Sequence, residues 1–263
     1  MNGVFPADLA VYLLFTPIVV YIFFAHRWTG FLPWYYLSVF CLARIIGGIL
    51  GIHDSNGLPA NIIQSVGLTP LILAVDGLVH EGCVVQPRFI YPIDLQADNW
   101  WSHRRVYRNP SSSRFLGWSV VIATSTVMIA AVALVITGSL HIFQGHPQSG
   151  SYTQWKVGTV LIAVTWGFQM LWSLLSLLPS RGSKGAAGYH GGTALIQGAF
   201  VALVFLGVRV IYGIVSVFTQ RRDLSPIYGS LAVRVVLMFL PEVFAALTMI
   251  VVGIRTRHLR QTT

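Results

Sequence analysis

The sequence predicts an all-α membrane protein, a bundle of seven transmembrane helices in one polytopic domain. Seven apolar stretches of roughly 17 to 26 residues fill most of the chain, and crossing a bilayer as a helix takes about 20 apolar residues. Hydrophobic residues make up 55% of the 263 residues and charged residues 10%, and the mean hydropathy is +0.70. Because an ordinary soluble domain is about 25% charged, most of this surface is expected to face lipid.

Residues 1–263 are expected to form a single domain, because the spans leave no room for a separate soluble unit. Each span is an apolar run long enough to cross the membrane, and polar, glycine or proline residues bound it. The expected spans are 9–25, 34–52, 60–79, 116–141, 155–178, 193–218 and 230–254.

The first three spans carry features beyond their length. No basic region precedes the first span and no small-residue cleavage pattern follows it, so it is expected to be a retained helix; residues 1–8 before it are too short to fold. In the second span, Gly47 and Gly51 have the GxxxG spacing that lets helices approach closely. The third span has a polar face that must contact protein or water, followed by Pro70. The polar residues are Asn61, Gln64, Ser65 and Thr69.

Basic residues are unevenly divided between the two sides of the predicted bundle. The first, third and fifth connections and the C-terminal tail carry one, five, two and three Lys or Arg residues, eleven on that side. The opposite side carries Lys156, Arg221 and Arg222. The positive-inside rule then places the N-terminus in a lumen or outside the cell and the C-terminus in the cytoplasm. We expect a multi-pass protein of the endoplasmic reticulum or plasma membrane, with no nucleic-acid partner despite the net charge of +9.

The longest connection, residues 82–115, is expected to be a cytoplasmic loop at the membrane surface. It contains Trp100 and Trp101, which favour the headgroup region, and a basic run from Arg104 to Arg114. Basic side chains near anionic lipid gain about 1 kcal/mol each. The loop is either an orientation signal with interfacial anchors or a lid over a substrate site.

Three charged residues lie deep inside predicted spans: Arg44, Arg209 and Glu242. A charge left unpaired at the bilayer centre costs several kcal/mol, so these side chains are expected to meet in one layer. Helical spacing adds Tyr212 beside Arg209 and places Arg234 on the side of Glu242. The layer is either a network of ion pairs that fixes helix register or a functional site. Between two arginines Glu242 would stay ionised, whereas in an apolar cavity it would become a usable acid.

A second acidic group, Asp76 and Glu81, lies near the cytoplasmic end of the third span and supplies two further candidate acids. Solvation at the membrane interface is the simpler explanation for both. Asp54 follows His53 at the opposite mouth of the predicted polar interior. This pair is either an acid/base dyad or a polar helix end, and adjacent residues of a helix do not face each other.

Several kinds of chemistry lack their residues in this sequence. It has no aspartate-rich cluster for magnesium and diphosphate, no clustered histidines for iron or zinc, and no Gly-x-Ser-x-Gly turn. We therefore expect no metal site and no cofactor. An odd number of spans also fits poorly with a transporter built from two inverted repeats.

Four segments of the chain show a likeness to a known family. They are Val39 to Ile52 with Cys41-Leu-Ala-Arg44-Ile-Ile-Gly47, Asn61 to Glu81 with Gly67-Leu-Thr-Pro70, Val208 to Ser216, and the segment around Glu242. Together they resemble a family of fungal seven-span membrane proteins known as domain of unknown function 7702. The resemblance implies a fungal integral membrane protein and no particular activity. The 82–115 connection departs from the family pattern.

In size and in its lack of metal-binding motifs, the chain is also similar to fungal membrane-embedded terpene cyclases, with no shared motif. That comparison implies a metal-independent cyclase of a prenylated or epoxidised terpenoid or meroterpenoid in fungal secondary metabolism. Glu242, Asp76 or Glu81 would protonate the substrate, and aromatic rings would stabilise the cation. The alternative is a seven-helix receptor or a lipid or small-molecule exporter without enzymatic activity. Either function implies a hydrophobic or lipid-like ligand within membrane lipid, bound or structurally supported by Arg44, Arg209, Tyr212, Arg234 and Asp54.

Overall fold

The computed structural model describes residues 4–26, 30–54, 57–85, 110–143, 150–177, 189–219 and 230–257. Almost all residues in these ranges are helical, and the ranges contain no strand. Seven segments are long and apolar enough to cross a membrane, which confirms the predicted all-α, seven-span fold. These segments are Phe5–His26, Phe31–His53, Ile62–Cys83, Trp118–His141, Ser151–Leu177, His190–Thr219 and Leu231–Thr256.

The third and seventh segments are each built from more than one helix. In chain order the helices of the described residues are α1 (Val4–His26), α2 (Phe31–His53), α3 (Leu58–Val66), α4 (Leu68–Val85), α5 (Pro110–Phe143), α6 (Ser151–Leu177), α7 (Tyr189–Thr219), α8 (Leu231–Arg234), the π-helix η3 (Val235–Phe239) and α9 (Leu240–Thr256).

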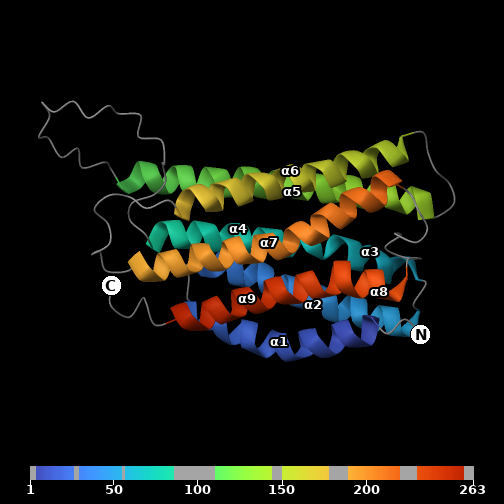
Figure 1. The fold of residues 1–263 in the computed structure, drawn as a ribbon, viewed down its shortest axis with the longest axis horizontal. Coiled ribbons are helices and arrows are strands. Elements are labelled where there is room, and N and C mark those ends of the chain that lie inside the picture. The colour runs from blue at the N-terminus through green and yellow to red at the C-terminus, as the bar shows by residue number, and fades with distance from the viewer. Residues whose placement is uncertain are drawn as a thin grey trace, which may run out of the picture.

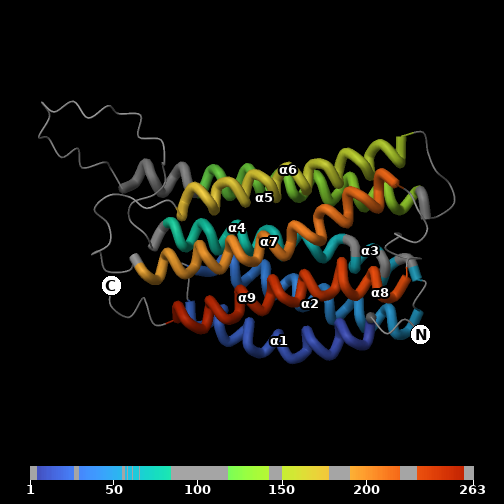
Figure 2. The backbone as a smooth tube through the Cα atoms, viewed as in Figure 1, coloured from blue at the N-terminus to red at the C-terminus, as the bar shows by residue number. Residues whose placement is uncertain are grey.

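The helices run along the long axis of the bundle, so that α1 begins and α9 ends at opposite ends (Figure 1). Helices α5 and α6 pack against each other along one side, and α1 lies on the other side, against α2 (Figure 2). Helices α4 and α7 lie between them, and the span that contains α4 is the most buried of the seven. Apolar side chains fill the interior, including Trp34, Leu71, Leu206 and Met249.

The third span is broken at Gly67, three residues before Pro70. Proline lacks the backbone N–H, and its ring clashes with the carbonyl of the residue four positions earlier. That residue is Val66, where α3 ends. The break expected from Pro70 therefore appears one turn towards the N-terminus of the proline, and it leaves the C-terminal end of α3 inside the bundle.

The seventh span contains a turn of π-helix, η3, directly before Pro241. The N–H of Leu240 bonds the carbonyl of Val235, five residues earlier, so the wider turn absorbs one extra residue. In a continuous α-helix, eight residues would leave Arg234 and Glu242 about 80° apart around the axis, whereas the extra residue reduces this to about 20°. The π turn therefore places Arg234 and Glu242 on the same face.

Glycines allow the closest helix contacts. A Cβ on Gly47 would meet Ile63 of α3, and one on Gly51 would meet Phe5 of α1, so the glycine face of α2 packs against both helices. Between α5 and α6, a Cβ on Gly138 or Gly158 would lie 2.7 Å from a backbone atom of the other helix. This second close approach involves glycines that the sequence analysis did not single out.

Two predicted features lie largely or entirely outside the described residues. Residues 86–109, most of the expected 82–115 loop, are not described, and neither are Arg221 and Arg222. The expected unstructured start at residues 1–8 is corrected, because α1 begins at Val4 and includes Asp8.

Candidate functional site

The centre of the bundle contains a carboxylate held by two guanidinium groups from different helices. Glu242, on α9, accepts a hydrogen bond at Oε2 from Arg44 Nη2, on α2. Its other oxygen, Oε1, lies 3.1 Å from Arg209 Nε, on α7. All three side chains are buried, and Glu242 is 0% exposed. The structure thus brings together the three charged residues that the sequence singled out.

Asp8 of α1 extends this group of charges, and the sequence analysis missed it. Its Oδ2 accepts a hydrogen bond of 2.7 Å from Gln64 Nε2 of α3 and lies 3.8 Å from Arg44 Nη1. Asp8 is 0% exposed. The signal that could have identified it is a carboxylate directly before the first apolar run, in a chain with three buried arginines. We call Asp8, Arg44, Arg209 and Glu242 the ion-pair layer.

The break in the third span makes room for the Arg44 guanidinium. A Cβ on Gly67 would lie 3.1 Å from Arg44 Nε and 3.2 Å from its Cζ, so a larger residue would press on this group. Pro70 lacks the N–H that would bond the Val66 carbonyl, so the C-terminal end of α3 carries partial negative charge. Arg44 is therefore stabilised by two carboxylates and by the end of a broken helix.

Arg234 and Tyr212 lie next to the ion-pair layer, and each has a different neighbour there. Arg234 is 3% exposed, and its guanidinium carbon lies 5.8 Å from the centre of the Phe5 ring. Its Nε has no hydrogen-bond partner, and within the described ranges it forms no ion pair. Tyr212 is buried with its ring centre 5.8 Å from the Arg209 guanidinium carbon.

Positive charge exceeds negative charge in this region. The ion-pair layer together with Arg234 has three arginines and two carboxylates, all buried. Several buried polar atoms here also lack a hydrogen-bond partner, and they are Asp8 Oδ1, Tyr12 OH, Arg44 Nε, Gln64 Oε1 and Arg234 Nε. Buried polar groups are normally satisfied, so these atoms indicate a site that is completed by water or a ligand.

The remaining predicted acids lie apart from the layer. Asp76 of α4 is buried and accepts a hydrogen bond of 2.6 Å from Thr124 of α5. Glu81 is also buried, and its carboxylate contacts Gly30 at the N-terminal end of α2, where a negative charge is favourable. Asp54 is exposed at the C-terminal end of α2, and its carbonyl accepts a hydrogen bond from Gly57 N. The structure therefore does not join these three to Glu242.

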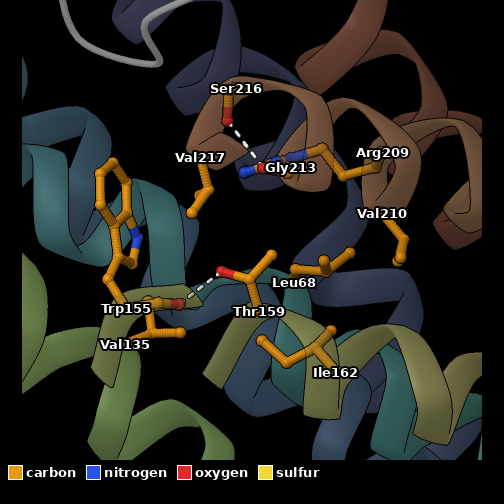
Figure 3. A pocket seen from close by; sticks show the side chains of 10 residues that line it. All are labelled: Leu68, Val135, Trp155, Thr159, Ile162, Arg209, Val210, Gly213, Ser216 and Val217. Atoms are coloured by element: carbon orange, nitrogen blue, oxygen red, sulfur yellow. Dashed lines mark hydrogen bonds between the residues drawn. The ribbon is translucent and has the colours of Figure 1, made fainter. Parts of the chain in front are cut away.

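A cavity of about 70 Å³ lies beside Arg209, where α5, α6 and α7 meet the start of α4 (Figure 3). Arg209 reaches into it from α7, with its guanidinium beside Gly213 and Ser216, while Thr159 faces it from α6. The other lining residues are mainly apolar and are Leu68, Val135, Trp155, Ile162, Val210 and Val217. The volume is far below the roughly 300 Å³ of a pocket that encloses a drug-sized ligand.

In the part of the chain that the structure describes, no three His, Cys, Asp or Glu side chains gather into a set that could hold a metal ion. What the site offers instead is a carboxylate between guanidiniums and a small cavity that one of those guanidiniums enters.

Seven apolar helices around a charged interior define the class of this molecule, a multi-pass membrane protein. The family model described as a domain of unknown function, DUF7702, matches residues 1–85 and 104–259, and the chain belongs to that family. This match confirms the family resemblance and extends it over all seven spans. Within the 82–115 connection it leaves out residues 86–103 only, so the expected departure of the whole connection from the family pattern is corrected to this shorter part. No curated protein and no solved structure matches the chain.

Proposed function

We propose that this protein is a receptor-type membrane protein without enzymatic activity, in which the ion-pair layer holds the resting arrangement of the helices. The observation that carries the proposal is the position of Glu242 on α9, bonded to Arg44 of α2 and Arg209 of α7 with no exposed surface. One carboxylate thus connects three helices, and its loss would release both ion pairs at once.

The same geometry makes Glu242 a poor acid catalyst. An acid catalyst must hold a proton that it can transfer to the substrate, whereas a carboxylate between two guanidiniums is most favourable in its charged form. Both Glu242 oxygens are already occupied by Arg44 and Arg209. A buried ion-pair network is instead suited to hold one arrangement of the helices until the ion pairs are released.

The two native cysteines provide a test of this proposal. Cys41 lies one turn before Arg44 on α2 and is 0% exposed, so we expect it to resist maleimide. With Cys83→Ser in the background, Glu242→Gln should open the interface between α2 and α9 and raise the rate of Cys41 labelling. The measurement is the rate of N-ethylmaleimide addition to the full chain in lipid nanodiscs, followed by mass spectrometry.

Cys83 is the matched control, because it is buried in α4 about 24 Å along the helix axis from Gly67. In a Cys41→Ser background its labelling should not respond to Glu242→Gln. A rise at both cysteines would indicate general unfolding, and no rise at Cys41 would show that the layer only contributes stability. Either result would argue against the receptor proposal.

Asp76 favours a second candidate function, the metal-independent terpenoid cyclase of fungal secondary metabolism. This carboxyl group is buried, accepts one hydrogen bond from Thr124, and forms no ion pair within the described ranges. Of the three candidate acids it is the one whose surroundings would tolerate a proton. Microsomes that contain the native chain, supplied with epoxidised and plain prenylated substrates, would form a cyclic product, and Asp76→Asn at equal abundance would abolish it. A product that persists in this variant would exclude Asp76 as the acid.

We also propose the orientation of the protein in the membrane and the membrane in which it lies. Arg255 in the last turn of α9 and Arg257 directly after it lie at the end of the bundle that the sequence predicts to be basic. The positive-inside rule favours a cytoplasmic C-terminus on this side, in the endoplasmic reticulum or plasma membrane.

A further inference from the structure

We propose that the cavity beside Arg209 binds the carboxylate head of an amphipathic ligand, such as a long-chain fatty acid. This inference names the class of ligand for the proposed receptor. Only its effect on the ion-pair layer rests on the proposed function. Binding at the cavity can be measured by itself.

Arg209 has unused hydrogen-bond donors at the cavity. Its Nε donates to Glu242, and its Nη1 and Nη2 groups make no hydrogen bond to any described residue. The side chain is 5% exposed and borders the cavity. A guanidinium binds a carboxylate through two parallel N–H groups, so the two Nη nitrogens suit a planar anionic head.

Two hydroxyl groups add adjustable partners around the same cavity. Ser216 Oγ donates to the carbonyl of Gly213, and Thr159 Oγ1 donates to the carbonyl of Trp155 (Figure 3). Each hydroxyl can rotate towards an anion, since these backbone carbonyls also belong to the helix hydrogen-bond ladder. The cavity thus presents a cation and two hydroxyls within an otherwise apolar wall.

The charge balance of the interior also favours an anion. The ion-pair layer together with Arg234 contains three arginines and two carboxylates, which leaves one positive charge in excess in this cluster. A single carboxylate at Arg209 would restore neutrality. A zwitterionic or uncharged ligand would leave the excess in place, and burying an uncompensated charge is costly.

The cavity size limits what can be enclosed. At about 70 Å³ it holds a small polar head and not a whole lipid. It is also partly open, and its apolar lining from α5, α6 and α7 belongs to membrane-spanning helices. We therefore infer that the head is enclosed while the tail leaves through the opening and lies along the apolar surface of these helices.

Occupancy of this site would act on the ion-pair layer through Arg209. The ligand carboxylate and Glu242 would share one guanidinium, which weakens the contact between α7 and α9. Arg44 would then be the remaining strong partner of Glu242. A ligand bound from the lipid side would thus affect the ion-pair layer through one side chain, that of Arg209.

Native mass spectrometry of the purified full chain in a non-ionic detergent can test the binding. The probe is palmitic acid, with methyl palmitate as the uncharged analogue and lysophosphatidic acid as the phosphate-headed analogue. We expect one palmitate per chain, no adduct with the methyl ester and a weaker adduct with the phosphate. Equal binding of palmitate and its methyl ester would overturn the proposal, and tighter binding of lysophosphatidic acid would overturn the carboxylate assignment.

Two glycine variants provide a matched pair. A Cβ on Gly213 would lie 3.9 Å from Arg209 Nη1, so Gly213→Leu should fill the cavity without disturbing the backbone. A Cβ on Gly167 of α6 would meet no atom within 4 Å, so Gly167→Leu adds the same side chain elsewhere. We expect Gly213→Leu to bind palmitate about tenfold more weakly or worse, and Gly167→Leu to bind it as the native chain does. Equal binding by both variants would overturn the site.

Cys41 labelling separates this site from the proposed function. Palmitate bound in a Gly213-dependent way, without faster Cys41 labelling, would support the site and contradict the receptor. Faster Cys41 labelling in Glu242→Gln, without palmitate binding to the native chain, would support the receptor and contradict the site.

Discussion

Glu242→Gln is expected to lower the free energy of unfolding by about 3–5 kcal/mol, the usual cost of removing one partner from a buried ion pair. The variant leaves Arg44 and Arg209 buried without their shared carboxylate, and both side chains are at most 6% exposed. The amide of glutamine has nearly the same shape, so the loss reports charge and not packing. Denaturant titration in mixed micelles measures it.

Other substitutions in the ion-pair layer should lower the free energy of unfolding by different amounts. Asp8→Asn should cost less than Glu242→Gln, because Asp8 lies 3.8 Å from Arg44 and its bond to Gln64 can be kept by an amide. Adding Arg209→Gln to Glu242→Gln should restore part of the stability, because it removes one of the two charges left without a partner. Purely additive losses in the double variant would contradict an ion-pair network.

Gly158→Ala is expected to destabilise the protein by about 1–3 kcal/mol, the range for overpacking a close contact. The added Cβ would lie 2.7 Å from the Ala131 carbonyl oxygen and 3.0 Å from the Val135 backbone nitrogen, both on α5. Backbone atoms cannot turn away as a flexible side chain can, so α5 and α6 must move apart. The loss is measured by the same titration.

The control is the same substitution on the same helix at Gly167, where a Cβ would have open space. In a helix interior, alanine is favoured over glycine by about 1 kcal/mol, so Gly167→Ala should leave stability unchanged or raise it. Gly158→Ala should therefore lower the free energy of unfolding, and Gly167→Ala should not. Similar shifts would show that α5 and α6 do not pack as closely as their glycines indicate.

The sequence predicts the seven spans well, because each is a long apolar run that few other sequence patterns resemble. It also predicts that Arg44, Arg209 and Glu242 meet, since an isolated charge in a bilayer is too costly to leave unpaired. Both predictions follow from the lipid bilayer as the solvent of the spans. They require no knowledge of which helices are neighbours.

Features that depend on local backbone geometry could not be predicted in the same way. The π turn that aligns Arg234 with Glu242 reflects Pro241, yet a proline can also be relieved by a kink or a break, as Pro70 shows at Gly67. Asp8 was missed because helix ends are the least certain part of a span. The cavity at Arg209 depends on side-chain packing between four helices, which periodicity does not contain.

The ion-pair layer takes its charges from the first, second, sixth and seventh spans, and synthesis delivers them to the membrane in that order. Asp8 and Arg44 arrive together, but Arg209 enters the bilayer before Glu242 has been made. During that interval two guanidiniums share one carboxylate, a state that water must help to stabilise. The early spans can therefore be inserted without being fully folded, and the last span completes assembly. Biogenesis of this bundle finishes at its C-terminal end.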